Sequence, residues 1–202
     1  MCAAEQDELN VYQSAEARFE IAAQKLALED GTIVKGETNI SRSRKRIERV
    51  RLCPRRARPL AEVLQALRQA DLILVGPGSL YTSLIPNLLI DEVVDVITHS
   101  RARCVYIANL MTQPGETQHY SVADHVQAIY QHTRRRIFDS VVLNRTAVPP
   151  GLLRRYRAQG SEPVRASLQE LHQMGLNVIT GCLLYTSPSP RDSTSSRMPS
   201  SA

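Results

Sequence analysis

The stretch ADLILVGPGSLYTSLIPNLLIDEVVDVI, residues 70–97, decides the fold, because it joins an unbroken aliphatic strand to a helix through a loop of small and hydroxylated residues. Residues 72–75 are aliphatic without interruption, which is typical of a strand covered on both faces in a parallel sheet. A Gly-Pro-Gly run ends this strand. From Pro86 to Ile97 the spacing of apolar residues then predicts one helix packed on the sheet.

The other elements alternate in the same way along the chain. An Asp-Gly pair at Asp30 is a hairpin signal and predicts two antiparallel strands around it. Ser121 with Asp124, and Ser167 with Glu170, have the spacing of capping boxes that begin helices. Further helices are predicted over 59–69 and 149–159, and further strands over 103–108, 138–143, 163–164 and 177–180. The expected fold class is α/β, a Rossmann-like three-layer domain with a largely parallel sheet plus a small β-hairpin.

The composition is that of an ordinary globular domain, with 43% hydrophobic and 22% charged residues in a chain of 202. No apolar run reaches the roughly 18 residues of a transmembrane helix, and the first residues resemble no signal peptide. We therefore expect a cytoplasmic protein without a membrane partner. The four cysteines are far apart and form no CxxC pair, so neither a metal site nor a disulfide framework is predicted.

A basic run accounts for much of the net charge of +5, since nine Lys and Arg residues lie between positions 42 and 58. Such a run raises the hypothesis of nucleic-acid binding. Against it, no aromatic residues are interleaved for base stacking, and Val50 and Leu52 alternate with arginines as in a strand with one wet face. We expect a solvated basic strand and loop, and whether some of these arginines face phosphate groups is left open.

The glycine loop is the first candidate ligand site. Gly76 and Gly78 allow backbone conformations that other residues avoid, and Gly78 is expected to adopt a positive φ. Ser79 and Thr82 offer hydroxyls beside the N–H groups of a helix start, a place where phosphates bind. An ordinary strand-to-helix connection is the alternative, because glycine and serine are common there. The loop is neither a Walker loop nor a GxGxxG motif.

The segment NLMTQPGETQHY, residues 109–120, is the second candidate. Asn109, Thr112 and Gln113 crowd polar groups into a loop at the carboxyl end of a predicted strand. If this strand is parallel to residues 72–75, both loops leave the same edge of the sheet, where α/β proteins bind ligands. The alternative is a solvated Pro-Gly turn.

Two motifs resemble a known family. GPGSLYTSLIPNLL, residues 76–89, and YIANLMTQPGETQHYSVADHVQAI, residues 106–129, stand in the order and spacing of the CofD-like family. They are most similar to its YvcK branch, the gluconeogenesis factors. The resemblance begins at about residue 26, includes LEDGTIVKGETNI, and ends at about residue 180, so it covers most of the chain.

The resemblance implies a non-catalytic cytoplasmic protein that binds a nucleotide sugar, such as a UDP-sugar, or another dinucleotide or diphosphate. It implies an influence on central carbon metabolism, cell-wall synthesis and cell shape. In this branch a tyrosine of the helix at 149–159 is associated with the ligand site, and Tyr156 matches it by position; a half-buried packing tyrosine is the alternative. The other branch implies a different function, transfer of a phospholactyl group onto the deazaflavin Fo. The GPGSLYTS pattern favours the first function, and a homo-oligomer is left open.

The ends of the chain fall outside the resemblance. We expect a partial CofD/YvcK-like domain over residues 1–181 and a non-native or disordered tail over 182–202, which is rich in serine and proline and resembles a translated adaptor remnant. The family pattern implies that a glycine-rich loop and the first strands should precede this half. The domain is therefore expected to be incomplete at the N-terminus and to expose apolar surface and a sheet edge.

Overall fold

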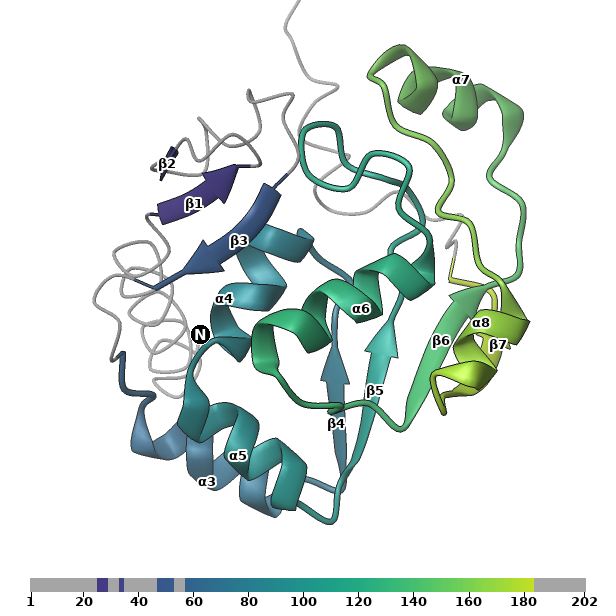
Figure 1. The fold of residues 1–202 in the computed structure, drawn as a ribbon. Helices are drawn as coiled ribbons and strands as arrows, with labels where there is room; N and C mark the ends of the chain where they lie inside the picture. Colours follow the sequence, from purple (N-terminus) through teal and green to yellow (C-terminus); the bar gives the residue numbers. More distant parts are fainter. Residues whose placement is uncertain (1–24, 29–32, 35–46, 53–56, 184–202) are drawn as a thin grey trace, which may run out of the picture.

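The fold contains one small antiparallel sheet and one larger parallel sheet with helices (Figure 1). The structure is a computed structural model, and it describes residues 25–28, 33–34, 47–52 and 57–183. No helix in these ranges is long and apolar enough to cross a membrane. The predicted tail is described only at Cys182 and Leu183, and the N–H of Leu183 donates to Asn144 Oδ1 at 3.0 Å.

The small sheet confirms the predicted hairpin. Strand β1 (Lys25–Leu28) pairs antiparallel with β2 (Ile33–Val34), and β3 (Ile47–Arg51) pairs antiparallel with the other edge of β1. The turn expected at Asp30 lies outside the described residues. In β3, Ile47 and Val50 are buried while Arg49 and Arg51 are exposed, so this strand has the one wet face that its alternating sequence predicts.

The larger sheet confirms the predicted α/β class. Its strands are β4 (Leu72–Val75), β5 (Arg103–Ile107), β6 (Ser140–Asn144) and β7 (Asn177–Gly181), all parallel and in the order β4-β5-β6-β7. Consecutive strands are neighbours, which is the arrangement that repeated strand-helix-strand units produce.

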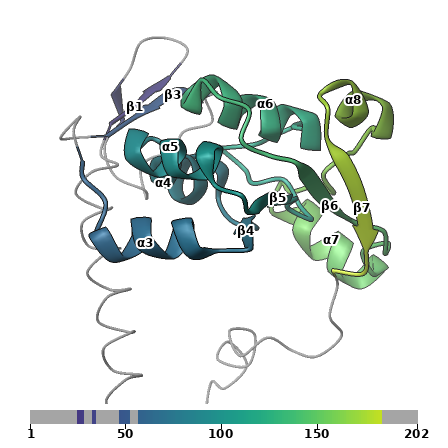
Figure 2. The same ribbon diagram turned by 90° about the horizontal axis from the view of Figure 1, so that it is seen from below.

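In the part of the chain that the structure describes, six α-helices and one short π-helix accompany the strands. They are α3 (Ala61–Gln69), the π-helix η1 (Leu80–Leu84), α4 (Ile85–Leu88), α5 (Asp91–His99), α6 (Val122–Thr133), α7 (Pro150–Ala158) and α8 (Leu168–Gln173). Figure 2 shows α4, α5, α6 and α8 on one side of the sheet and α7 on the other. Helix α3 packs beside α5.

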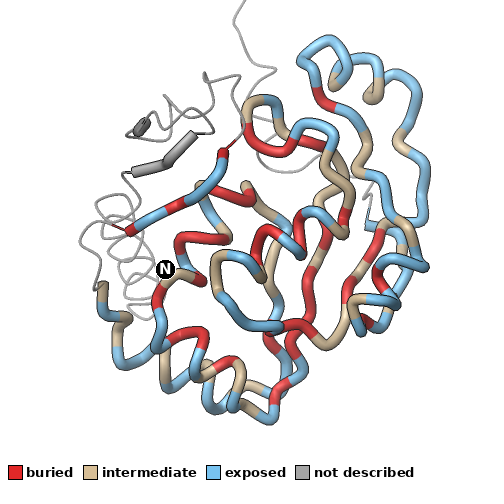
Figure 3. The backbone as a smooth tube through the Cα atoms, in the orientation of Figure 1, coloured by how far each residue is buried: buried red, intermediate tan, exposed pale blue. Residues whose placement is uncertain are grey.

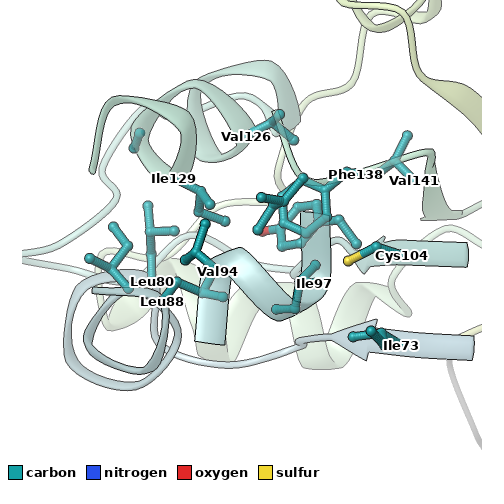
Figure 4. Close-up of a cluster of buried hydrophobic side chains, with 14 of the residues drawn as sticks. Ile73, Leu80, Leu88, Val94, Ile97, Cys104, Val126, Ile129, Phe138 and Val141 are labelled. Carbon is teal, nitrogen blue, oxygen red and sulfur yellow. The ribbon is translucent and has the colours of Figure 1, made fainter. Parts of the chain in front are cut away.

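The core lies between the sheet and the layer of α4, α5, α6 and α8 (Figures 3 and 4). Ile73, Cys104 and Val141 point into it from three neighbouring strands. The expectation that β4 is covered on both faces is wrong, because Leu72 and Leu74 are 53% and 56% exposed. β4 is the end strand of the order β4-β5-β6-β7, and Figure 2 shows α4 and α5 on only one side of it.

The predicted single helix after the glycine loop is also wrong, because the chain forms η1, α4 and α5 in succession. The N–H groups of both Ser83 and Leu84 donate to the carbonyl of Ser79 at 3.0 Å, which gives the wider turn of η1. Ile90 is extended, with φ −85° and ψ 108°, and separates α4 from α5. Helix α5 can restart there because two acidic residues occupy its first turn, which suits a helix N-terminus.

The helix start and stop signals are largely confirmed. Ser121 and Asp124 form both halves of a capping box at the start of α6. At the start of α8, Ser167 accepts the N–H of Glu170 at 3.3 Å, but the return bond of a full box is not formed. Gly175 has a φ of +80° directly after the end of α8, as expected for a C-terminal cap.

The difference in burial between Cys104 and Cys182 predicts that the two thiols react differently with an alkylating reagent. Cys104 is 2% exposed, and desolvation, with Asp139 nearby, raises the pKa of its thiol to about 12. Cys182 is exposed. Because alkylation requires the thiolate, iodoacetamide at pH 8 should modify Cys182 in the native protein and leave Cys104 intact until guanidinium is added. Peptide mass mapping checks this, and rapid native labelling of Cys104 would contradict the buried position.

Candidate functional site

The two polar loops meet at one edge of the sheet. Because β4 and β5 are parallel neighbours, the loops that follow them leave the sheet at the same end (Figure 1). The Asn109 side chain joins them: its Oδ1 accepts the N–H of Gly78 at 3.1 Å, and its Nδ2 donates to the Gly78 carbonyl at 2.8 Å. This two-point contact holds the glycine loop against the second loop as a neighbouring backbone would.

Gly76 is the loop glycine that adopts a positive φ, and the expectation of a positive φ at Gly78 is wrong. Gly76 has a φ of +91°, and a Cβ there would lie 2.8 Å from the carbonyl oxygen of Ile107. Gly78 lies outside the positive region, and a Cβ on it would lie 3.2 Å from Leu84 Cδ2. The chain therefore turns immediately after β4, where it passes closest to β5, and only glycine satisfies both conditions at that point.

A buried carboxylate lies at the start of η1. Glu116 is 7% exposed, and its two oxygens accept the N–H of Tyr81 and the hydroxyl of Thr82, both at 3.4 Å. A carboxylate is favourable beside the exposed N–H groups of a helix start. Glu116 thus occupies part of the position expected for a ligand anion, and the predicted donor Thr82 is engaged by the protein itself. The sequence analysis gave Glu116 no role, although its place after a Pro-Gly turn was a usable signal.

The side-chain amide of Gln113 has one end that forms no hydrogen bond. Its Nε2 donates to Ser79 Oγ at 2.7 Å, while its Oε1 is buried with no hydrogen-bond partner. The two ends of a glutamine amide can be interchanged, so one end bonds Ser79 and the other remains available in either orientation. The N–H groups of Ser79 and Leu80 also have no acceptor among the described residues. Unused donors and an unused amide therefore gather beside the glycine loop.

Two of the predicted site residues, Thr112 and Tyr156, do not belong to this cluster. Thr112 is 5% exposed; its N–H donates to the Glu162 carbonyl at 2.7 Å, and its hydroxyl accepts the Glu162 N–H at 2.9 Å. These bonds accompany an isolated bridge between Met111 and Pro163, and a second isolated bridge pairs Ser121 with Arg165. The strand predicted over 163–164 is therefore replaced by isolated bridges. Thr112 therefore fastens the loop to a neighbouring segment.

Tyr156 lies half-buried on α7, beyond the end of β6 (Figure 1). Among the described residues no side-chain hydrogen bond or ring contact connects it to the glycine loop. The structure thus brings together six of the eight predicted residues at the edge of β4 and β5, and leaves Thr112 and Tyr156 in other roles or places. The six are Gly76, Gly78, Ser79, Thr82, Asn109 and Gln113.

A polar cleft that the sequence did not indicate lies between β3 and α6. It has a volume of about 370 Å³. Its lining includes Tyr81 and Tyr120, whose hydroxyls lie 2.8 Å apart, together with Asp124 and Gln127. A second cleft, of about 440 Å³, lies beside it and is lined partly by Arg49 and Arg51 of the basic run. Among the described residues no group of three or more His, Cys, Asp and Glu could hold a metal ion.

Helix α6 carries a half-buried histidine, His132, and a buried one, His125. His132 Nε2 accepts the N–H of Val50 at 3.1 Å while its Nδ1 lies 2.7 Å from the carbonyl of Ala128, so the ring joins β3 to α6. His125 is 1% exposed, and its Nδ1 lies 2.8 Å from the Ser121 carbonyl. Desolvation lowers the pKa of both imidazoles, and Arg49 lowers that of His132 further. Both are therefore neutral in the folded protein near pH 7.

A parallel wound sheet with its polar loops gathered at the carboxyl edge defines the class of protein: an α/β protein with a candidate ligand site at the usual edge. The chain belongs to the family described as 2-phospho-L-lactate transferase CofD, whose model matches residues 2–184.

Similar proteins carry a different name within this family. The chain is 45% identical over 152 residues to a gluconeogenesis factor from Bacillus subtilis, covering 75% of this chain and 48% of the relative. It is 43% identical over 153 residues to one from Halalkalibacterium halodurans, covering 76% and 48%. A crystal structure of a UPF0052 family member from Bacillus halodurans superposes with a TM-score of 0.77 at 41% identity, covering 80% of this chain and 52% of that one. The chain thus spans about half the length of the relatives that it matches.

The Asn109 contact predicts a measurable loss of stability. Asn109→Ala removes both bonds to Gly78 and leaves a part-buried N–H without its acceptor, which should cost about 1–3 kcal/mol of unfolding free energy. The matched control is Asn87→Ala, at an exposed asparagine whose Nδ2 donates to the Ser83 carbonyl at 2.6 Å within one helical segment. Urea unfolding measures both variants, and equal losses would show that Asn109 has no special role.

The buried His125 and the half-buried His132 lead us to expect that stability depends on pH. Their pKa values are lowered in the folded protein, so the unfolded chain binds protons more readily and stability falls as the pH decreases below about 6.5, the pKa of an unperturbed histidine. His132→Gln can keep an acceptor for Val50 and should reduce this decline. Urea midpoints at pH 7.5, 6.5 and 5.5 test it, and an unchanged decline in the variant would exclude His132 as a cause.

Proposed function

We propose that the site at the carboxyl edge of β4 and β5 binds the diphosphate of a nucleotide sugar such as a UDP-sugar, with Ser79 and Gln113 as its principal contacts. The observation that carries the proposal is the unpartnered buried end of the Gln113 amide, beside Ser79 and next to the N–H groups of Ser79 and Leu80, which have no acceptor among the described residues. Backbone N–H groups at a helix start are the groups that hold phosphates in other α/β proteins.

Glu116 limits where the anion can lie. Its carboxylate occupies the N–H of Tyr81 and the hydroxyl of Thr82, and a phosphate at the same point would meet like charge. The diphosphate is therefore placed on the Ser79 side of the loop, with Gly76 and Gly78 allowing a close approach of the backbone. Asn109 acts by holding Gly78, and the sugar or base lies toward Gln113.

The relatives support the cellular side of the proposal. Proteins 45% and 43% identical to this chain are named gluconeogenesis factors, which favours a role in central carbon metabolism. We propose that this role is non-catalytic and cytoplasmic and that it extends to cell-wall synthesis and cell shape. The family description favours the other candidate, transfer of a phospholactyl group onto the deazaflavin Fo. The two differ in chemistry, because only the second requires turnover of the bound ligand.

The ligand proposal is tested in a chimera that supplies the rest of a relative. In the Bacillus subtilis relative, the matched stretch is replaced by this chain, and UDP-glucose is titrated calorimetrically. Gln113→Leu should weaken binding at least about tenfold, equivalent to about 1.4 kcal/mol, while Gln127→Leu, at an exposed glutamine of α6, should not. UMP, which lacks the second phosphate and the sugar, should bind at least about tenfold more weakly than UDP-glucose.

Two outcomes would contradict the proposal. Equal affinities of the chimera and its Gln113→Leu variant would place the diphosphate elsewhere. Formation of phospholactylated Fo from a guanosine diphosphate donor, checked by mass spectrometry in the same preparation, would favour the transferase.

A further inference from the structure

The two clefts between β3 and α6 adjoin each other. Both are lined by Glu48 of β3 and Gln131 of α6, and their volumes are about 370 and 440 Å³. Figure 2 shows β3 beside α6, where the two clefts lie. Volumes of roughly 300–1,000 Å³ are typical of sites that bind small molecules. We call the two clefts together the β3–α6 groove.

The end of the groove nearest the C-terminus of α6 is basic. Arg49 and Arg51 line it, and both side chains are exposed. Neither forms an ion pair or a side-chain hydrogen bond with another described residue. Residues two apart on a strand share a face, so both guanidinium groups are directed to the same side of β3. Together they outnumber the carboxylate of Glu48, and paired arginine N–H groups suit a phosphate monoester.

His132 closes this end of the groove without adding charge. Its Nε2 accepts the N–H of Val50 at 3.1 Å, and its Nδ1 lies 2.7 Å from the Ala128 carbonyl, so both ring nitrogens are engaged. Burial lowers the pKa of this imidazole, and Arg49 lowers it further. The neutral ring therefore holds β3 against α6 and leaves the binding of an anion to the arginines.

The other end of the groove carries hydroxyl, amide and carboxylate groups. The hydroxyls of Tyr81 and Tyr120 lie 2.8 Å apart, and their rings meet edge to face at 6.4 Å. Asp124 uses one oxygen, Oδ2, for both of its bonds to Ser121, and Gln127 completes the polar lining. No arginine or lysine of the described residues lines this end. Carboxylate oxygens repel a second anion and accept hydrogen bonds from hydroxyl groups.

We propose that the β3–α6 groove binds a sugar monophosphate, with its phosphate on Arg49 and Arg51 and its hydroxyls toward Tyr120 and Asp124. Gln131 lines both clefts and is placed to bond either part of the ligand. The ligand must be asymmetric because the groove is, with cations at one end and a carboxylate at the other. A dicarboxylate or an extended diphosphate would bring its second charge to the Asp124 end, where it is repelled.

The groove is a different site from the one proposed for the nucleotide sugar. Neither Ser79 nor Gln113 is among the described residues that line it. The start of η1 separates the two sites: the N–H of Tyr81 is bonded to Glu116 beside the glycine loop, while Tyr81 also lines the groove. The second site therefore does not rest on the function proposed above, and either can fail alone.

The test uses the 202-residue chain and isothermal titration calorimetry, with glucose 6-phosphate as the probe and with glucose and inorganic phosphate as its two halves. Glucose 6-phosphate should bind at least about tenfold more tightly than either half, because only it reaches both ends of the groove. Tyr120→Phe removes a hydroxyl from the sugar end. It should weaken glucose 6-phosphate about threefold or more and leave the affinity for inorganic phosphate unchanged.

The basic end is tested by substitutions at exposed positions. Arg49→Gln and Arg51→Gln should each weaken the binding of glucose 6-phosphate at least about tenfold, since each removes a charged hydrogen bond to the phosphate. The matched control is Arg154→Gln, at an exposed arginine of α7 that makes the same change in net charge. It should leave the affinity unchanged.

Four results would overturn the proposal. The first is no binding of glucose 6-phosphate up to about 1 mM, the upper end of common metabolite affinities. The second is equal affinity for inorganic phosphate, which would leave only an anion-binding surface. The third is an equal loss in Arg154→Gln, which would indicate unspecific attraction. The fourth is binding that Gln113→Leu weakens and Arg49→Gln does not, which would place the probe at the glycine loop.

Discussion

The parallel pairing of β4 with β5 is the constraint on which the rest of the structure depends. It fixes Val75 opposite Tyr106, so that both strands end at the same level and both polar loops leave the same edge. Across that edge, the side-chain amide of Asn109 forms hydrogen bonds with both the N–H and the carbonyl of Gly78, as the backbone of a neighbouring strand would. Without the pairing, residues 31 positions apart would have no reason to meet. With it, Asn109 bonds Gly78 and Gln113 bonds Ser79 across the two loops.

The same edge shows how a buried charge can shape an anion site. A carboxylate inside a protein is costly unless it is hydrogen-bonded, and Glu116 lies where η1 presents an N–H and a hydroxyl. This arrangement stabilises the loop and at the same time removes two donors from any ligand. The polar groups that remain unused belong to the neighbouring residues Ser79, Leu80 and Gln113. A buried internal anion therefore determines which part of the loop stays available.

The distribution of burial around the sheet has the same origin in topology. One face of the sheet receives α4, α5, α6 and α8, and its side chains are almost fully buried. On the other face, Leu72, Leu74 and Ile179 are exposed to solvent, whereas Val105 is buried. The free energy of that exposed surface is unfavourable, since each square ångström of buried apolar area is worth about 25 cal/mol.

The sequence by itself determined the α/β class, the parallel strands and most helix boundaries, because continuous aliphatic runs, capping residues and turn residues act locally. It also determined that the loops after β4 and β5 would carry the polar groups. It could not show that Gly76 rather than Gly78 adopts the positive φ, since that depends on the carbonyl of Ile107 on the neighbouring strand. Nor could it show that Glu116 accepts hydrogen bonds from Tyr81 and Thr82, or that Thr112 bonds to Glu162. It also could not show that Leu72 and Leu74 of β4 are exposed. Those features arise from contacts between segments distant in sequence, and only the tertiary structure decides which segments meet.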